Sequence, residues 1–201
     1  MLYIITMTVV SDRDRVDELL SALAEQLAAD GEAIELVVIG GSALIALGLV
    51  QRATRDIDVV ALLEDGDLVR PDPLPDRLVR ARDRVARDFA LPLDWLNAAP
   101  HSLLDFGLPA GFVDRLQCRR YGDFLTVHFA SRLDQIHFKL YALVDQGAGK
   151  HEQDIRALRP TTVELLQAAR WAQTHDPSEG FRQELAKALD YLGAGDADLG
   201  A

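Results

Sequence analysis

A glycine pair that joins an apolar segment to a short helix is the first part of the pattern that most constrains this chain. The segment Ile34–Ile39 predicts a short buried strand, because it is apolar, rich in β-branched residues and bounded by glycines. Gly40-Gly41-Ser42 follows it and leads into a predicted helix that includes Ala43–Leu47. Glycine lets the backbone approach a ligand closely, and the N–H groups at a helix start attract phosphate. The sequence therefore predicts a phosphate cradle here, with a plain strand-to-helix connection as the alternative.

The second part of the pattern is a strand that opens with two aspartates. Asp56–Leu62 predicts this strand, and Asp56 and Asp58 point to one face of it, because side chains alternate along a strand. Adjacent carboxylates repel each other unless a cation lies between them, and oxygen ligands suit Mg²⁺, with Mn²⁺ as an alternative ion. The alternative is a solvated acidic pair. A phosphate cradle beside a divalent-metal site is typical of nucleotide chemistry.

The order of strand, Gly-Gly-Ser, spacer and Asp-x-Asp resembles the nucleotidyltransferase superfamily, which shares the palm fold of DNA polymerase β. In that superfamily the glycine-serine turn holds the triphosphate and the paired aspartates bind two Mg²⁺ ions. The resemblance implies an α+β fold with a mixed central β-sheet flanked by helices and a helical C-terminal portion. It also implies that Gly40, Gly41 and Ser42 bind nucleotide, and that Asp56 and Asp58 are catalytic metal ligands.

The superfamily takes a third carboxylate from a later strand, and the candidate here is Asp94. It lies among apolar residues after Pro92, which suits a short strand, so Asp94 is the predicted third metal ligand and catalytic residue. The alternative is a partly exposed aspartate beside a structural Trp95. Asn97 could cap the next helix, near His101–Phe106.

Further residues narrow the resemblance to the bacterial branch that contains the AbiEii-type abortive-infection toxins. The resemblance adds Arg52, Thr54 and Arg55 as nucleotide-binding residues, Lys139 as a nucleotide-binding and catalytic residue, and Asp154 as a catalytic residue. Alternatives stay open: the arginines could be solvated loop residues, and Lys139 could be a solvated lysine of the predicted helix Leu133–Gln146. Asp154 could orient Lys139, or it could be a first-turn helix acid favoured by the helix dipole.

Other enzyme classes find little support in the sequence. The five histidines include no pair at zinc-binding spacing, and the glycine motifs of P-loop and dinucleotide-binding folds are absent. No serine-nucleophile elbow occurs, and Cys118 has no evident activating base in its sequence context. A single cysteine suits a reducing compartment, and no segment reads as a signal peptide or membrane span, so we expect a cytoplasmic protein without a membrane partner.

The net charge of −11 bears on the partners. Proteins that grip nucleic acid through phosphates need a basic surface. Four arginines recur at helical spacing along Pro75–Ala90, but aspartates interleave with them, which favours a solvated, salt-bridged helix. The charge therefore favours a protein or small-molecule acceptor over RNA, without excluding RNA.

The rest of the chain supplies the scaffold. We expect an α/β core over residues 1–131 and a helical portion over residues 132–201, packed as one unit. The core includes a helix at Asp12–Ala29 capped by Ser11 and a hairpin of Arg115–Tyr121 and Phe124–Phe129. In the helical portion, Thr161 and Glu164 form a predicted capping box.

The predicted activity is transfer of a nucleoside monophosphate from an NTP to a hydroxyl of an RNA acceptor, such as tRNA, or of a protein acceptor. The resemblance also implies a role in a toxin–antitoxin or phage-defence pair, with a cognate toxin or antitoxin as partner. The rival interpretation is a catalytically silent nucleotide-binding or protein-interaction module of the same fold.

Overall fold

The computed structural model describes residues 10–147 and 149–195. The residues around Met7 and the end of the acidic tail, for which the sequence suggested an alternative start and a frayed end, lie outside these ranges. The contacts within the chain divide it into two compact units. The first contains residues 10–105 and 116–130, and the second contains residues 106–115 and 131–195. The domain boundaries predicted from the sequence stay a prediction, and each unit is described by itself.

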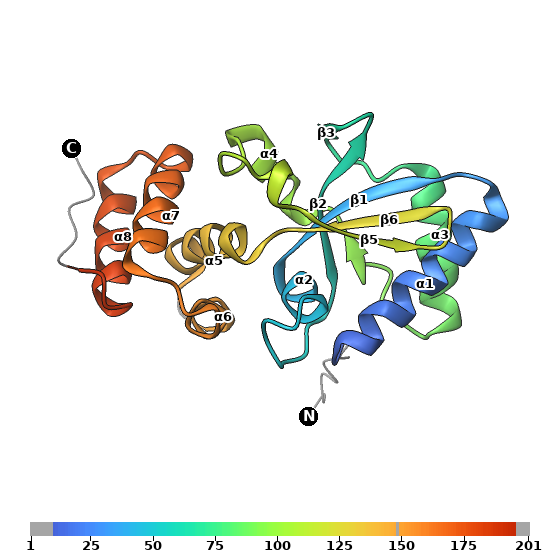
Figure 1. Ribbon diagram of the computed structural model, residues 1–201, viewed down its shortest axis with the longest axis horizontal. Helices are drawn as coiled ribbons and strands as arrows, with labels where there is room; N and C mark the ends of the chain where they lie inside the picture. The colour runs from blue at the N-terminus through green and yellow to red at the C-terminus, as the bar shows by residue number, and fades with distance from the viewer. Residues whose placement is uncertain (1–9, 148, 196–201) are drawn as a thin grey trace, which may run out of the picture. The chain divides into compact units, whose positions relative to one another are not determined.

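The first unit is built on one mixed β-sheet (Figure 1), in the strand order β3-β2-β1-β6-β5, with β4 paired to β2. The central strand β1 is antiparallel to β2 and parallel to β6, which confirms the predicted α+β class with a mixed sheet. The strands are β1 (Ile34–Ile39), β2 (Ile57–Glu64), β3 (Asp67–Val69), β4 (Leu96–Asn97), β5 (Gln117–Tyr121) and β6 (Leu125–Phe129).

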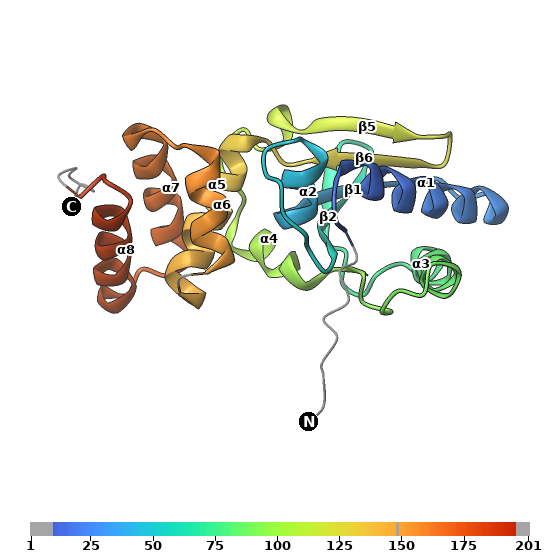
Figure 2. The same cartoon turned by 90° about the horizontal axis from the view of Figure 1, so that it is seen from below.

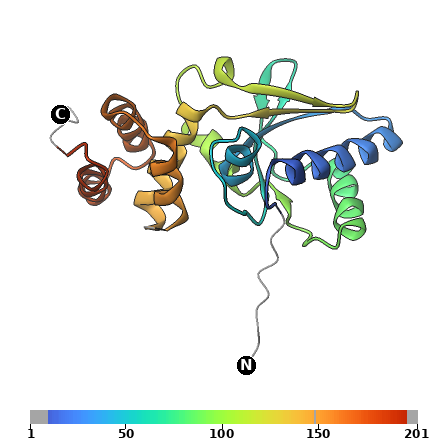
Figure 3. The ribbon, with the colours of Figure 1, turned by 60° about the horizontal axis from the view of Figure 1, so that its bottom comes forward.

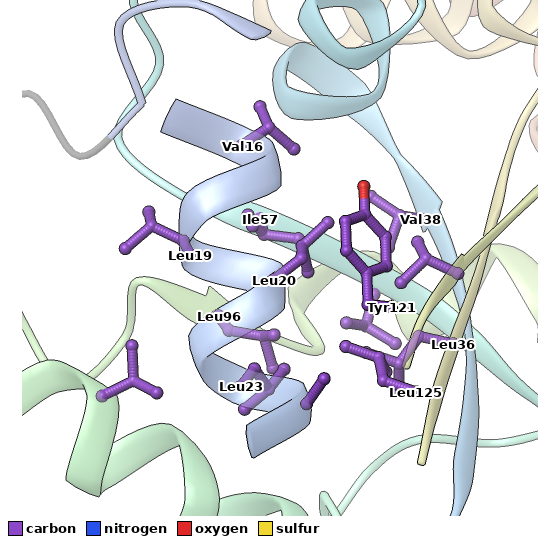
Figure 4. Close-up of a cluster of buried hydrophobic side chains, with 14 of the residues drawn as sticks. Val16, Leu19, Leu20, Leu23, Leu36, Val38, Ile57, Leu96, Tyr121 and Leu125 are labelled. Atoms are coloured by element: carbon purple, nitrogen blue, oxygen red, sulfur yellow. The ribbon is translucent and has the colours of Figure 1, made fainter. Parts of the chain in front are cut away.

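Three helices, α1 (Arg13–Asp30), α2 (Gly40–Ala46) and α3 (Asp76–Asp88), contribute to the core of the first unit, and α1 runs along one face of the sheet (Figure 2). Figure 4 shows α1 side chains packed against residues of β1, β2, β4, β5 and β6. The α1 residues in this core are Val16, Leu19, Leu20, Leu23 and Leu27, at the spacing that predicted the helix. The predicted cap is off by one residue, because Asp12 rather than Ser11 accepts the Arg15 N–H, at 2.9 Å.

A polar contact fastens α1 to the sheet at the edge of this core. Asp17 of α1 accepts hydrogen bonds from the Tyr121 hydroxyl at 2.6 Å and from Arg119 at 2.7 Å. Arg119 also donates to the carbonyl of Ala46, at the end of α2 (Gly40–Ala46), at 3.1 Å. Burial raises the pKa of the Tyr121 hydroxyl, so it stays protonated and donates to Asp17. The contact therefore joins α1, α2 and β5.

The second unit is helical, with α5 (Arg132–Gln146), α6 (Lys150–Leu158), α7 (Thr162–His175) and α8 (Glu179–Tyr191) (Figure 3). α5 packs against each of the other three helices. The segment 106–115 belongs to this unit, because Arg115 pairs with the buried Asp134 at 2.5 Å and Trp171 donates to the Gly107 carbonyl at 3.1 Å. The sequence gave no indication of this packing.

The predicted capping box at the start of α7 is confirmed: Thr161 accepts the Glu164 N–H, and Glu164 accepts the Thr161 N–H. α8 starts at Glu179, and the Ser178 side chain caps it by accepting the Phe181 N–H. The segment from β4 to β5 contains two 3-10 helices, η1 (Ala99–His101) in the first unit and η2 (Val113–Arg115) in the second, and the short α4 (Ser102–Phe106). Over the described ranges, the chain forms no helix that combines the length and apolar character needed to cross a bilayer.

Candidate functional site

The Gly40 turn lies directly against Asp58. β1 and β2 are antiparallel, and Ile39 pairs with Asp58, so the end of β1 and the start of β2 meet at one end of the sheet. Gly40 has φ +77°, which disfavours any side chain, and a Cβ built there would lie 2.6 Å from Asp58 Oδ2. A glycine is therefore required at this position both by the backbone and by the closeness of the carboxylate.

The second glycine lies against the loop that precedes β2. A Cβ at Gly41 would lie 2.8 Å from Thr54 Oγ1 and 3.0 Å from Arg52 Nη2. The backbone of Thr54 is held by two hydrogen bonds with Val10, at 2.8 and 3.1 Å, and its hydroxyl lies 3.5 Å from Asp56 Oδ1. The structure thus brings Arg52 and Thr54 to the glycine turn, whereas Arg55 lies exposed on the same loop.

Ser42 is the residue whose environment is most unusual for its chemistry. Its side chain is fully buried, and its hydroxyl has no hydrogen-bond partner. Leaving a buried hydroxyl without a partner costs free energy, on the order of 1–3 kcal/mol. This orphaned donor matches the acceptor chemistry of a phosphate oxygen, and a phosphate would reach it only if the turn opened, because the hydroxyl is enclosed.

Asp58 is the second residue of β2, and Asp56 directly precedes the strand, which was predicted to begin at Asp56. Ile57 and Val59 are fully buried in the core, and Asp58, partly buried between them in the sequence, lies on the opposite face of the strand. A face shared by Asp56 and Asp58 stays a prediction. Mg²⁺ commonly uses one or two protein carboxylates together with substrate phosphates. The pair beside the turn therefore fits one Mg²⁺ that arrives with a nucleotide.

The strand predicted to carry Asp94 is wrong. Asp94 lies exposed in a turn that the Trp95 N–H closes on the Pro92 carbonyl, at 3.2 Å, and β4 begins only at Leu96. The residue paired with Asp58 across the β2–β4 ladder is Asn97. No group of three or more His, Cys, Asp or Glu side chains suited to a metal ion occurs in residues 10–147 and 149–195. A metal-binding role for Asp94 stays a prediction.

In the second unit the structure brings Lys139 and Asp154 together. Lys139 Nζ lies 2.8 Å from Asp154 Oδ2, and the two residues are only 5% and 1% exposed. The interpretation of Lys139 as a solvated lysine is therefore wrong: α6 packs against α5 and buries it with its partner. Asp154 is not a first-turn acid either, since Glu152 holds that place in α6.

The arginine-rich helix is the salt-bridged helix that its interleaved charges predicted. From α3, Arg84 donates to Asp30 at 3.1 and 3.2 Å, and Arg77 and Arg80 lie 3.5 and 3.9 Å from Glu32. Asp30 and Glu32 lie at the end of α1 and just after it. These arginines therefore neutralise carboxylates of the protein itself.

Comparison with known proteins agrees with this geometry at the level of the family. The searches of curated proteins and of solved structures found no significant match. The chain matches a protein family over residues 16–163, a range that covers the glycine turn, the aspartate pair and Lys139 with Asp154. Since this range is more than half of the chain, the protein belongs to that family, which is described as nucleotidyltransferase of unknown function (DUF6036).

Proposed function

We propose that the protein is a Mg²⁺-dependent nucleotidyltransferase that moves a nucleoside monophosphate from an NTP to an acceptor hydroxyl. The acceptor oxygen forms a bond to the α-phosphorus, the bond from that phosphorus to the bridging oxygen breaks, and pyrophosphate leaves. The hydroxyl proton passes to solvent. The observation that carries the proposal is the closeness of the Gly40 turn to Asp58, since a Cβ built at Gly40 would lie 2.6 Å from Asp58 Oδ2.

The first unit supplies the residues that would hold the nucleotide. Gly40 and Gly41 let the phosphates approach the backbone, and the Ser42 hydroxyl would donate to one of them if the turn opened. Arg52, next to Gly41, supplies positive charge, and Thr54 fixes the loop against the turn. Arg55, exposed on the same loop, is proposed to contact the triphosphate from the solvent side.

Asp56 and Asp58 are the proposed protein ligands for the metal. A bound Mg²⁺ would offset the negative charge that develops on the leaving pyrophosphate. The two aspartates would hold that ion beside the glycine turn, with Asp58 in β2 and Asp56 directly before it.

Lys139 and Asp154 are proposed to take part through the Lys139 ammonium. Its charge suits a phosphate, and the ion pair with Asp154 holds the ammonium in a fixed place. The family match extends over both residues, which supports a shared role.

The acceptor is proposed to be a hydroxyl of a protein or of an RNA such as tRNA. The negative charge of the chain and the internal pairing of the α3 arginines favour the protein. A place in a toxin–antitoxin or phage-defence pair, with a cognate protein partner in a bacterial cytoplasm, is part of this proposal and rests on the sequence resemblance.

The test is a labelling assay with each α-³²P NTP, Mg²⁺ and either total RNA or cell lysate. Asp56→Asn and Asp58→Asn keep the side-chain shape and remove charge at the proposed ligands. Glu64→Gln, at the exposed far end of the same strand, is the matched control. We expect label on an acceptor with the wild type and Glu64→Gln, and its loss in both aspartate variants. Metal-independent NTP binding with no label from any acceptor would instead favour the silent module.

A further inference from the structure

Asn97 holds the place on the neighbouring strand where the superfamily pattern leads one to expect a third acidic residue. β4 runs parallel to β2, and its register pairs Leu96 with Ile57 and Asn97 with Asp58. Leu96 and Ile57 both point into the core (Figure 4). Because side chains alternate along a strand, Asn97 lies on the same face as Asp58. The residue adjacent to the aspartate pair is therefore a neutral amide.

The hydrogen bonds of Asn97 fix the direction in which its amide points. Its Oδ1 accepts the N–H of Ala99, the first residue of η1, at 2.8 Å. Its Nδ2 then faces the Asp94 carbonyl at 3.3 Å and Asp58 Oδ1 at 3.5 Å. An amide NH₂ has only donor hydrogens, which attract a carboxylate oxygen and repel a cation. The amide oxygen, the one atom of Asn97 able to bind a metal, faces away from Asp58.

We infer, on the basis of the proposed function, that this site binds one divalent cation with its nucleotide rather than two, and that Asn97 positions Asp58. One carboxylate pair and the nucleotide phosphates suffice for one Mg²⁺. A second ion would need another acidic ligand at the Asn97 position, where the amide donor stands instead. Asn97 would act on the ion through Asp58: it does not bind the ion, but it orients the carboxylate that does.

The experiment counts Mn²⁺ ions bound to the full chain by electron paramagnetic resonance. The probe is Mn²⁺ titrated with a saturating α,β-methylene NTP analogue, which binds without releasing pyrophosphate. We expect one Mn²⁺ per wild-type chain and two per chain in Asn97→Asp, which restores the missing carboxylate with almost no change of shape. Asp94→Asn, in the exposed turn, is expected to keep one ion. Two ions in the wild type would overturn the inference, and their reduction to one by Asp94→Asn would assign the second ion to Asp94.

A second variant separates the positioning of Asp58 from the hydrogen bond that Asn97 accepts from Ala99. Asn97→Ala removes both, and we expect it to weaken Mn²⁺ affinity about 10-fold or more, the usual effect of losing an outer-shell partner. Lower thermal stability with unchanged Mn²⁺ affinity would leave Asn97 with a structural role in the turn alone and overturn the positioning role. If the wild type binds the analogue without any Mn²⁺, the proposed function itself fails, and this result is distinct from binding two ions.

Discussion

Asp154 Oδ2 lies 2.8 Å from Lys139 Nζ, and both residues are almost completely buried in the helical unit. Removing one partner of a buried ion pair leaves the other as an uncompensated charge, which costs about 3–5 kcal/mol. Replacing both partners by apolar groups of similar size is often neutral. Comparing the single variants with the double variant can therefore separate a structural role of the pair from a chemical one.

We predict that Lys139→Met and Asp154→Leu each lower the free energy of unfolding by about 3–5 kcal/mol, and that the double variant recovers most of the loss. Denaturant unfolding measures this. If the ammonium also serves the nucleotide, the stable double variant still loses transfer activity. A double variant with full activity would leave the pair with a structural role alone.

The contact of Gly40 with Asp58 gives a second prediction, with a natural control in the same unit. Gly40 and Gly48 have φ values of +77° and +70°, but no atom lies within 4 Å of a Cβ at Gly48. Gly48→Ala should cost only the backbone strain of roughly 1–2 kcal/mol. Gly40→Ala should cost more and abolish NTP binding, as measured by thermal unfolding and equilibrium binding. If Gly40→Ala and Gly48→Ala had the same effects on stability and on NTP binding, the contact of Gly40 with Asp58 would have no importance.

The buried imidazole of His137 makes the stability of the helical unit depend on pH. Burial lowers the pKa of His137, and its Nδ1 donates to the Leu133 carbonyl at 2.8 Å. The folded state thus disfavours the charged ring. The contribution of the neutral His137 ring to stability is complete above the pKa of His137 in the unfolded chain, about 6.5. This contribution is lost as the pH falls through the lowered pKa of His137 in the folded protein.

We predict that His137→Asn, which keeps a donor near the Leu133 carbonyl but does not titrate, reduces the loss of stability between pH 7.5 and pH 5.5. Denaturant unfolding at the two pH values measures this difference. The absolute stability of the variant is expected to be lower at pH 7.5 because the smaller side chain packs less well. If His137→Asn lost as much stability between pH 7.5 and pH 5.5 as the wild type, a group other than His137 would control this loss.

The salt bridges between α1 and α3 predict that the α3 arginines serve stability rather than acceptor binding. Arg84→Ala should cost no more than about 1 kcal/mol, because the pair with Asp30 is partly exposed, and the effect should shrink in high salt. It should leave nucleotide and RNA affinity unchanged. Arg55→Ala, on the exposed site loop, should weaken NTP affinity instead. Filter binding at two salt concentrations measures the NTP and RNA affinities of each variant. Loss of RNA binding in Arg84→Ala would contradict a purely structural role of the α3 arginines.

The sequence predicted the parts of the site that are close together in the chain. The span from β1 to β2 forms as a continuous strand, turn, helix and strand, so its local pattern was sufficient to bring Gly40 near Asp58. The strand Ile34–Ile39 has the predicted bounds, and the predicted hairpin is present as β5 and β6. Short-range periodicity and turn chemistry determine these features.

Features that depend on long-range packing were predicted less well. Asp94 follows Pro92 among apolar residues, and only the pairing of β4 with β2 reveals that Asn97, three residues later, is the neighbour of Asp58. Lys139 lay near the edge of an apolar helix face in the sequence, and its burial depends on the docking of α6. No local pattern could reveal that residues 106–115 pack with the second unit.

The bridge between Val10 and Thr54 has a practical consequence for anyone who engineers the protein. Two backbone hydrogen bonds attach the first described residue to the loop that carries Arg52 and Thr54. A truncation that removes Val10 would break both hydrogen bonds and release this loop. Shortened or fused versions of the protein should therefore keep Val10.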